Sequence, residues 1–366
     1  MNANYEARRR LLPLLRRLPE PLEARVRGLL CTARTDETPP HAELAYSERP
    51  GGEHAEMPGV SRRSVRGDSV VVLLYHRVAE DLNDPFRLSV GPQRFEEHMR
   101  IVKRHAEPVT LAEVLKRGQR PRVAVTFDDG YADNLLAGGP ILEAASMPAT
   151  VFVTSGAIGS QRPLWPLRLE ELFRLGEPRA DLIELDVAGN ALSVGTPRGG
   201  RSTEAMMAVH DLLTPLHPSA TAEAMKQLED HFGGDVSTGC RRMLSELEVR
   251  AMAATDIFTV GSHTRNHAWL SALDDTELDH EIAGSKADLE SITGRPIADF
   301  AYPFGTRISF GRGVTRAVRR AGFALACTTF DDPVAPGTGR YLVPRRPVHD
   351  WNGPQFEGRL LSWLAA

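Results

Sequence analysis

The sequence predicts an α/β protein built on a mostly parallel sheet. Three observations lead to this prediction: short apolar runs recur along the chain, helical patterns lie between them, and residues suited to catalysis directly follow several of the runs. Strands that alternate with helices form parallel sheets, and such sheets carry their chemistry at the carboxyl ends of the strands.

The predicted strands are short and buried. The first is the continuous apolar run Val70 to Leu74, typical of a strand covered on both faces. Similar runs predict strands at residues 123–127, 150–153, 258–260, 299–302 and 325–328. The clearest helix is expected from Asp274 to Thr293, with an acidic N-cap at its start and Gly294 at its end.

Three regions fall outside this alternation. Residues 1–67 are expected to form an N-terminal extension and linker. Their first 30 residues could form a basic amphipathic helix, for which docking on the protein, or a frayed terminus, is favoured over contact with an anionic membrane surface. Within the main domain of residues 68–352, residues 161–241 predict a largely helical insertion that either covers the substrate or packs without touching it. Residues 353–366 are expected to form a C-terminal tail.

Composition narrows the possible partners and the compartment. The net charge of −4 gives no reason to expect nucleic-acid binding, and no apolar run approaches the roughly 20 residues of a membrane span. The run Leu11 to Leu15 is broken by Pro13 and is too short for a secretory signal. Three scattered cysteines fit a reducing compartment, and Cys327 is expected to be a small core residue. We therefore expect a cytoplasmic location.

The first candidate site follows the predicted strand at residues 123–127. Asp128 and Asp129 stand side by side and Gly130 permits a tight turn after them. Adjacent carboxylates raise each other's pKa unless a cation lies between them, so one can ligate a metal ion while the other acts as a base. The same residues also occur as an ordinary turn or helix cap.

The second candidate site follows the run at residues 258–260. His263 and His267 are four residues apart, which places both imidazoles on one face of a helical turn and within reach of one metal ion. Together with a strand-end carboxylate they complete three protein ligands, the usual number for catalytic zinc. A third motif, residues 299–305, is a predicted strand followed by a turn with aromatic neighbours.

Taken in order, these three motifs resemble the polysaccharide deacetylase family, the nodulation-deacetylase homology domain. Supporting similarity lies near Tyr75-His76-Arg77-Val78, at Glu281 and Ser285 in the predicted helix, and at Pro344-Arg345. The resemblance extends over roughly residues 69–350. It implies a distorted (β/α) barrel of about seven strands, in agreement with the strand and helix pattern.

Position by position, the resemblance implies that Asp128 is the general base and that Asp129, His263 and His267 are the metal ligands. Such a site activates a water molecule for attack on an acyl carbonyl. The default metal is zinc, although two imidazoles and a carboxylate also bind cobalt, nickel or iron.

The resemblance also implies contacts to the substrate. A backbone N–H near Tyr131 or Tyr302 is expected to stabilise the oxyanion. The residues expected to contact the substrate or the oxyanion are Tyr131, Tyr302, Pro303 and Arg345.

The sequence departs from the most familiar family pattern in two places. Where the third motif often carries an arginine that orients the catalytic aspartate, this chain has Ala301, so the partner is expected elsewhere, at Arg345 or Arg346. The usual late Leu-x-His motif has only a poor counterpart around His349. A branch of the family takes its general acid from an early Tyr-His strand end, and His76 matches that place.

The function implied is metal-dependent removal of an N-acetyl group from an amino sugar, a glycan precursor or a sugar-containing natural product. A deformylase or an O-acetyl esterase would need the same metal and water. A sugar-binding module without turnover is a remote alternative, because all four residues of the candidate metal and base set are present.

Overall fold

The computed structural model describes residues 67–81, 84–160, 164–176, 180, 182–187, 189–195, 203–234 and 241–366. The predicted N-terminal helix lies outside these residues. The chain divides into two compact units. The described part of the first contains the parallel sheet, and the second comprises Leu169–Val236 within the described segments; each is considered by itself.

The first unit is built on an eight-stranded sheet in which every pairing between strands is parallel. Seven strands follow the order β11-β10-β9-β6-β5-β1-β12, and β4 pairs separately with β5. Their bounds are β1 Val70–Tyr75, β4 Glu107–Pro108, β5 Arg122–Phe127, β6 Ala149–Val153, β9 Phe258–Ser262, β10 Asp299–Ala301, β11 Leu325–Cys327 and β12 Arg346–Pro347. The predicted distorted barrel is therefore confirmed, including all six strands expected from apolar runs.

One late segment connects the two edges of this sheet. Val343 forms a parallel bridge with Cys327 at the end of β11, and three residues later Arg346 pairs with Leu73 in β1. The chain between these contacts thus spans the gap that the curled sheet leaves open. Arg345 lies in this short span and is completely buried.

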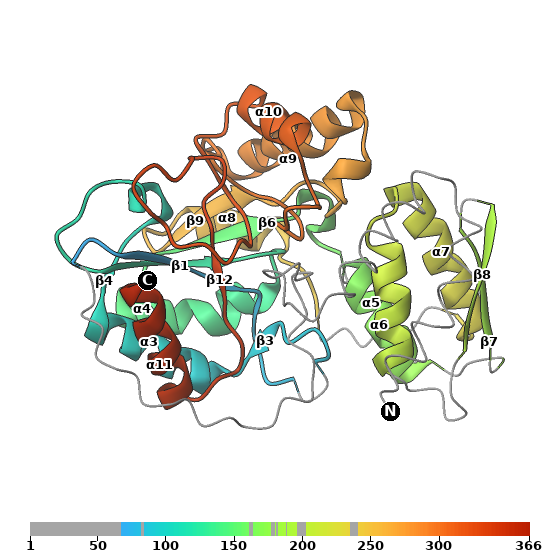
Figure 1. The fold of residues 1–366 in the computed structure, drawn as a ribbon, viewed down its shortest axis with the longest axis horizontal. Helices are drawn as coiled ribbons and strands as arrows, with labels where there is room; N and C mark the ends of the chain where they lie inside the picture. The colour runs from blue at the N-terminus through green and yellow to red at the C-terminus, as the bar shows by residue number, and fades with distance from the viewer. Residues whose placement is uncertain are drawn as a thin grey trace, which may run out of the picture. The chain divides into compact units, whose positions relative to one another are not determined.

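Helices of the first unit cover the outer face of the sheet (Figure 1). Figure 1 shows α3, α4 and α11 on one side of it, and α9 and α10 on the other. The α-helices are α3 Pro92–His105, α4 Gly139–Ala145, α8 Glu246–Ala253, α9 Asp275–Thr293, α10 Arg312–Arg320 and α11 Gly353–Ala365. Shorter elements are η1 Leu111–Glu113, η2 Asn134–Gly138, η3 Ser155–Ala157, η4 Leu270–Ala272 and the paired strands β2 Arg77–Val78 and β3 Ser89–Val90.

Helix α9 has the ends that its sequence predicts. Asp274 accepts a hydrogen bond from the Glu277 backbone amide, and the Glu277 side chain accepts one from the Asp274 amide. Gly294 ends the helix in the left-handed region at φ 64°, where a residue with a Cβ would be strained.

The residues expected to form a C-terminal tail instead form α11. Phe356, Leu360 and Leu364 recur at four-residue spacing and are completely buried in the main core, and the helix packs on α3. This spacing places one apolar stripe against the barrel unit, so residues 353–366 belong to its core.

The second unit is helical with one hairpin. It contains most of α5 Trp165–Leu175, together with α6 Thr203–Leu213 and α7 Pro218–His231, and β7 Leu182–Val187 pairs antiparallel with β8 Asn190–Gly195. Along β7 exposed and buried residues alternate strictly. That period of two is the mark of a strand with one covered face, and it identifies a hairpin that the largely helical prediction did not include.

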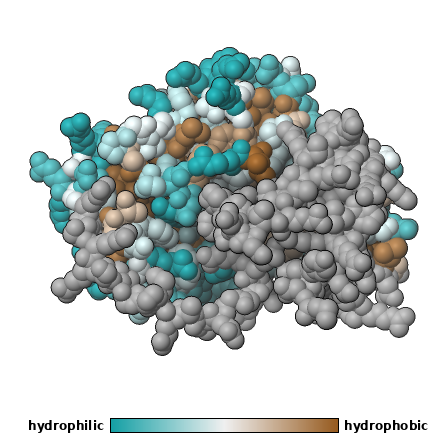
Figure 2. Space-filling view, viewed as in Figure 1, coloured by the Kyte–Doolittle hydropathy of each residue, from teal (hydrophilic) through white to brown (hydrophobic). Residues whose placement is uncertain are grey.

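Polar and charged side chains cover much of the visible surface of the barrel unit (Figure 2). On α10, four arginines are exposed while Val314, Ala317 and Val318 are buried against the core. Among the described residues, no helix combines the length and the apolar composition that crossing a membrane requires.

Candidate active site

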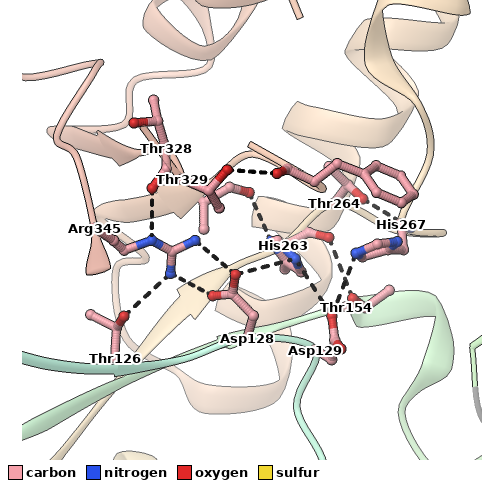
Figure 3. Close-up of polar contacts among 12 residues, drawn as sticks. Thr126, Asp128, Asp129, Thr154, His263, Thr264, His267, Thr328, Thr329 and Arg345 are labelled. Atoms are coloured by element: carbon pink, nitrogen blue, oxygen red, sulfur yellow. Dashed lines mark hydrogen bonds and ion pairs between the residues drawn. The ribbon is translucent and has the colours of Figure 1, made fainter. Parts of the chain in front are cut away.

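The strand register brings the predicted site residues together at the carboxyl end of the sheet. Tyr75 of β1 pairs with Phe127 of β5, so His76 and Asp128 follow at the same level. Val153 of β6 pairs with Ser262 of β9, which carries His263 to the same edge. Figure 3 shows the aspartates and histidines converging there.

The carboxylate of Asp128 is held by a buried guanidinium. Arg345 Nη1 and Nη2 donate to its two oxygens at 2.6 and 2.7 Å, and Nε and Nη1 also donate to Thr328 O and Thr126 Oγ1 (Figure 3). Although burial opposes ionisation, the positive charge of Arg345 lowers the pKa of Asp128 to about 2. Arg345 is thus the partner that Ala301 cannot provide, and it reaches Asp128 rather than the substrate.

Asp129, His263 and His267 form a group that could hold a metal ion. Asp129 Oδ1 lies 3.6 Å from His263 Nε2 and 3.5 Å from His267 Nε2. Tetrahedral zinc with bonds of about 2.0–2.1 Å needs ligand atoms about 3.4 Å apart. The spacing of these two pairs matches that requirement.

The protonation of these groups also suits a cation. Burial and the neighbouring Asp128 raise the pKa of Asp129 to about 8, and its Oδ1 has no hydrogen-bond partner among the described residues. Burial lowers the pKa of both histidines, which keeps them neutral. His263 Nδ1 donates to Ala301 O at 2.9 Å, so its Nε2 lone pair faces Asp129. A divalent cation would compensate the carboxylate charge at this point.

The expectation that the two histidines share a helical turn is wrong. Residues 263–267 form an irregular loop after β9, in which Thr264 and His267 have φ values of 64° and 53°. Thr264 Oγ1 accepts a hydrogen bond from the His267 amide at 3.0 Å. Asp129, Phe304 and Arg87 in the pocket wall also have positive φ, so five of the six described residues other than glycine with this geometry lie at the site. Backbone strain of this kind concentrates at functional sites.

A pocket beside the metal group contains both histidines considered as the general acid. His76 and His349 line it together with Asp128, His263 and His267, and its apolar wall includes Phe86, Leu88, Phe304 and Val348. His349 Nδ1 donates to Arg87 O at 3.1 Å. Burial lowers the pKa of His76 to about 4.

The other residues predicted to contact the substrate or the oxyanion, Tyr131, Tyr302 and Pro303, occupy different places around the site. Tyr302 has both donors engaged: its amide donates to Cys327 O and its hydroxyl to Tyr341 O. Tyr302 and Pro303 are buried and do not line the pocket. Tyr131 follows directly on the Asp129–Gly130 turn, and its side chain hydrogen-bonds Asp129. Tyr131 does not line the pocket either, whereas Phe304, two residues after Tyr302, does, so both backbone segments expected to hold the oxyanion stay candidates.

Two residues at the site were not anticipated. Asn134 donates to His76 O at 2.7 Å, and Asp133 accepts from Arg77 Nε at 3.0 Å and from the Val78 amide at 3.1 Å. They hold the segment that carries His76. Both closely follow the aspartate pair in the sequence, but a polar pair in a loop carries no local signal for such a distant partner.

The family profile described as Polysaccharide deacetylase matches residues 116–192 and 201–326. The chain belongs to the polysaccharide deacetylase family. These ranges include Asp128, Asp129, His263 and His267, whereas His76 and Arg345 lie outside them.

Individual relatives agree with this membership. YxkH of Bacillus subtilis (strain 168), whose name refers to the same family, is 29% identical over 112 residues, covering 29% of this chain and 39% of YxkH. IcaB from Ammonifex degensii has a similar fold, with a TM-score of 0.52, 21% identity and coverage of 82% of this chain and 99% of IcaB. BC0361, a polysaccharide deacetylase from Bacillus cereus, also has a similar fold, with a TM-score of 0.52 and 20% identity. The match covers 80% of this chain and 68% of BC0361.

Proposed function

We propose that this polysaccharide deacetylase family member is a metal-dependent hydrolase that removes an N-acetyl group from an amino sugar of a glycan, a glycan precursor or a sugar-containing natural product. One observation carries the proposal. The metal-type group of Asp129, His263 and His267 adjoins a carboxylate, Asp128, that a buried arginine keeps ionised and oriented.

Asp129, His263 Nε2 and His267 Nε2 would hold the cation and leave its pocket side for water and substrate. A bound divalent ion supplies Lewis acidity, which lowers the pKa of a water molecule and polarises an acyl oxygen. Asp128 lines the pocket and its charge is fixed by Arg345, so it serves as the acceptor for the proton of the attacking water. The backbone near Tyr131 or near Tyr302 is the proposed donor to the oxyanion.

Amide hydrolysis also requires a proton on the departing nitrogen. We assign this step to His76, which lines the same pocket and stands at the level of Asp128. With a pKa of about 4, the imidazole is neutral at pH 7, so the proton that it delivers to the nitrogen is the one that Asp128 takes from the attacking water and passes on to it. His349, which lines the same pocket after β12, would then contact the substrate.

The test combines metal analysis with product identification. Purified protein should contain or bind about one divalent ion and should release acetate and free amine from a panel of N-acetyl sugars, nucleotide sugars and glycosides. Release of formate, or of acetate only from O-acetyl esters, would replace the assignment by a deformylase or an esterase. Binding of sugars without any release, at full metal occupancy, would refute hydrolysis.

A further inference from the structure

One face of α9 contacts the loop that carries His263 and His267, two of the three candidate metal ligands. Glu281, Gly284, Ser285 and Asp288 follow the i, i+3, i+4, i+7 spacing of a single helical stripe. Each contacts the end of β9, the loop at residues 263–267, or a neighbour of that loop. The buried leucines and isoleucine of α9, Leu278, Ile282 and Leu289, pack separately in the main core.

Glu281 binds the middle of the loop. Its Oε2 accepts hydrogen bonds from the backbone amides of Arg265 at 3.1 Å and Asn266 at 2.9 Å, and its Oε1 accepts one from Asn266 Nδ2 at 2.6 Å. The glutamate is buried, with 5% of its surface exposed. A buried carboxylate is costly unless it is hydrogen-bonded, and here all three donors come from Arg265 and Asn266, which lie between the histidines.

The other three residues of this stripe, Gly284, Ser285 and Asp288, contact the same loop or its neighbours. Asp288 forms a bidentate pair with Arg265, with both distances 2.7 Å, and also accepts from Ser155 Oγ at 2.8 Å. Gly284 leaves the space for that guanidinium, because a Cβ at this position would lie 2.6 Å from Arg265 Cζ. Ser285 Oγ lies 2.6 Å from Ser262 Oγ, at the end of β9.

These contacts stabilise a loop conformation that is strained in itself. Thr264 and His267 adopt left-handed backbone geometry, which is strained for residues other than glycine. Without outside support the loop would relax and the two imidazoles would separate. We infer that Glu281 is a positioning residue for the metal site, fixing the 263–267 loop so that both histidines face Asp129 before a cation binds.

This inference rests on the proposed function, since it presumes that the site takes a divalent metal. Groups that orient metal ligands typically change affinity by about 10–100-fold when they are removed. Glu281→Ala deletes all three hydrogen bonds that Glu281 accepts from the loop and should therefore weaken Zn²⁺ or Co²⁺ binding about 100-fold. Glu281→Gln keeps the shape and one oxygen acceptor but loses the charge and the second acceptor, so it should weaken metal binding about 10-fold.

The experiment is isothermal titration of the metal-free full chain with Zn²⁺ and Co²⁺, together with the visible absorption spectrum of the Co²⁺ form, which reports the geometry of the ligands. Asp279→Ala removes a carboxylate from the exposed side of the same helix, where it pairs with Arg320. Leu289→Ala destabilises the buried side without touching the loop. Both controls should bind metal within about two-fold of the parent protein, with an unchanged spectrum.

Equal metal affinity of Glu281→Ala and the parent protein would overturn the inference. So would a loss in Leu289→Ala as large as that in Glu281→Ala, since general loosening of the helix would then suffice. If Glu281→Ala does not fold, Asp288→Asn and Glu281→Gln decide: unchanged affinity in both refutes the role. A parent protein that binds neither metal refutes the proposed metal dependence as well, whereas metal binding without deacetylation refutes the proposed function alone.

Discussion

Arg345 and Asp128 are 217 residues apart in the chain and form a bidentate ion pair at 2.6 and 2.7 Å in the interior of the barrel unit. Removing one partner of such a pair leaves an uncompensated buried charge and typically costs about 3–5 kcal/mol, whereas removing both is far less costly.

Arg345→Met should therefore lower the free energy of unfolding by about 3–5 kcal/mol, and the double variant Asp128→Asn/Arg345→Met should recover a large part of that loss. Urea denaturation of the metal-free variants, analysed as a double-mutant cycle, measures the coupling. Strict additivity of the two changes would show that the pair contributes no stability in this setting.

Asp128 and His263 should differ in what their loss does to the site. Asp128→Asn keeps the size of the side chain and all three candidate ligands, so it should retain the metal and lose turnover by at least about 10²-fold. His263→Ala should lose both metal and turnover. Metal content by mass spectrometry and acetate release separate the two effects, and equal metal loss in both variants would contradict the assigned roles.

The assignment of His76 as general acid predicts a dependence on the leaving group. His76→Ala should slow hydrolysis of an N-acetyl sugar by roughly 10²–10⁴-fold with unchanged metal content. An activated phenyl acetate ester needs little protonation and should lose far less activity. His349→Ala is the matched comparison in the same pocket, and selective loss on amides in that variant instead would transfer the role to His349.

His98 should contribute to acid sensitivity. Its Nε2 lies 2.8 Å from Trp351 O, its ring stacks on Phe356, and burial lowers its pKa to about 4. Because its folded-state pKa is below the unfolded value of about 6.5, its contribution is complete above pH 6.5 and is lost as the pH falls toward 4. The shift corresponds to about 3 kcal/mol.

The variant His98→Gln removes this titration. Urea denaturation of metal-free protein at pH 7.5 and 4.5 should show a smaller pH-dependent loss of stability in this variant than in the parent protein. The exposed residue His280 provides the control as His280→Gln, which should keep the parental loss. An unchanged pH response in His98→Gln would exclude His98 as a source of acid sensitivity.

The parts of the molecule that the sequence predicted correctly are those encoded by neighbouring residues. Strand β1 is a continuous apolar run, and α9 carries its own N-cap and terminating glycine. The site residues followed because the carboxyl ends of parallel strands share one edge. Helix α11 was also readable from the spacing of Phe356, Leu360 and Leu364, although it was expected to be a tail.

The remaining features depend on distant partners. The loop at residues 263–267 has helical spacing but not helical geometry, because Glu281 and Asp288 bind it from another element. The choice between Arg345 and Arg346 was open, since Arg345 directly precedes the short strand β12 and Arg346 begins it, and the sequence does not show which side chain faces inward. No local pattern distinguishes these cases.

The closing segment between Val343 and Arg346 has a consequence for the order of assembly. Chains emerge from the ribosome N-terminus first, so both aspartates and both histidines are synthesised before Arg345 is available. Until then Asp128 has no buried counter-charge, and the curled sheet lacks the segment that joins its edges. A nascent or prematurely terminated chain that ends before residue 345 would thus contain every candidate metal ligand. It would still lack the counter-charge of Asp128 and the segment that joins the two edges of the sheet. Catalytic competence would arise only after residue 345 has been synthesised.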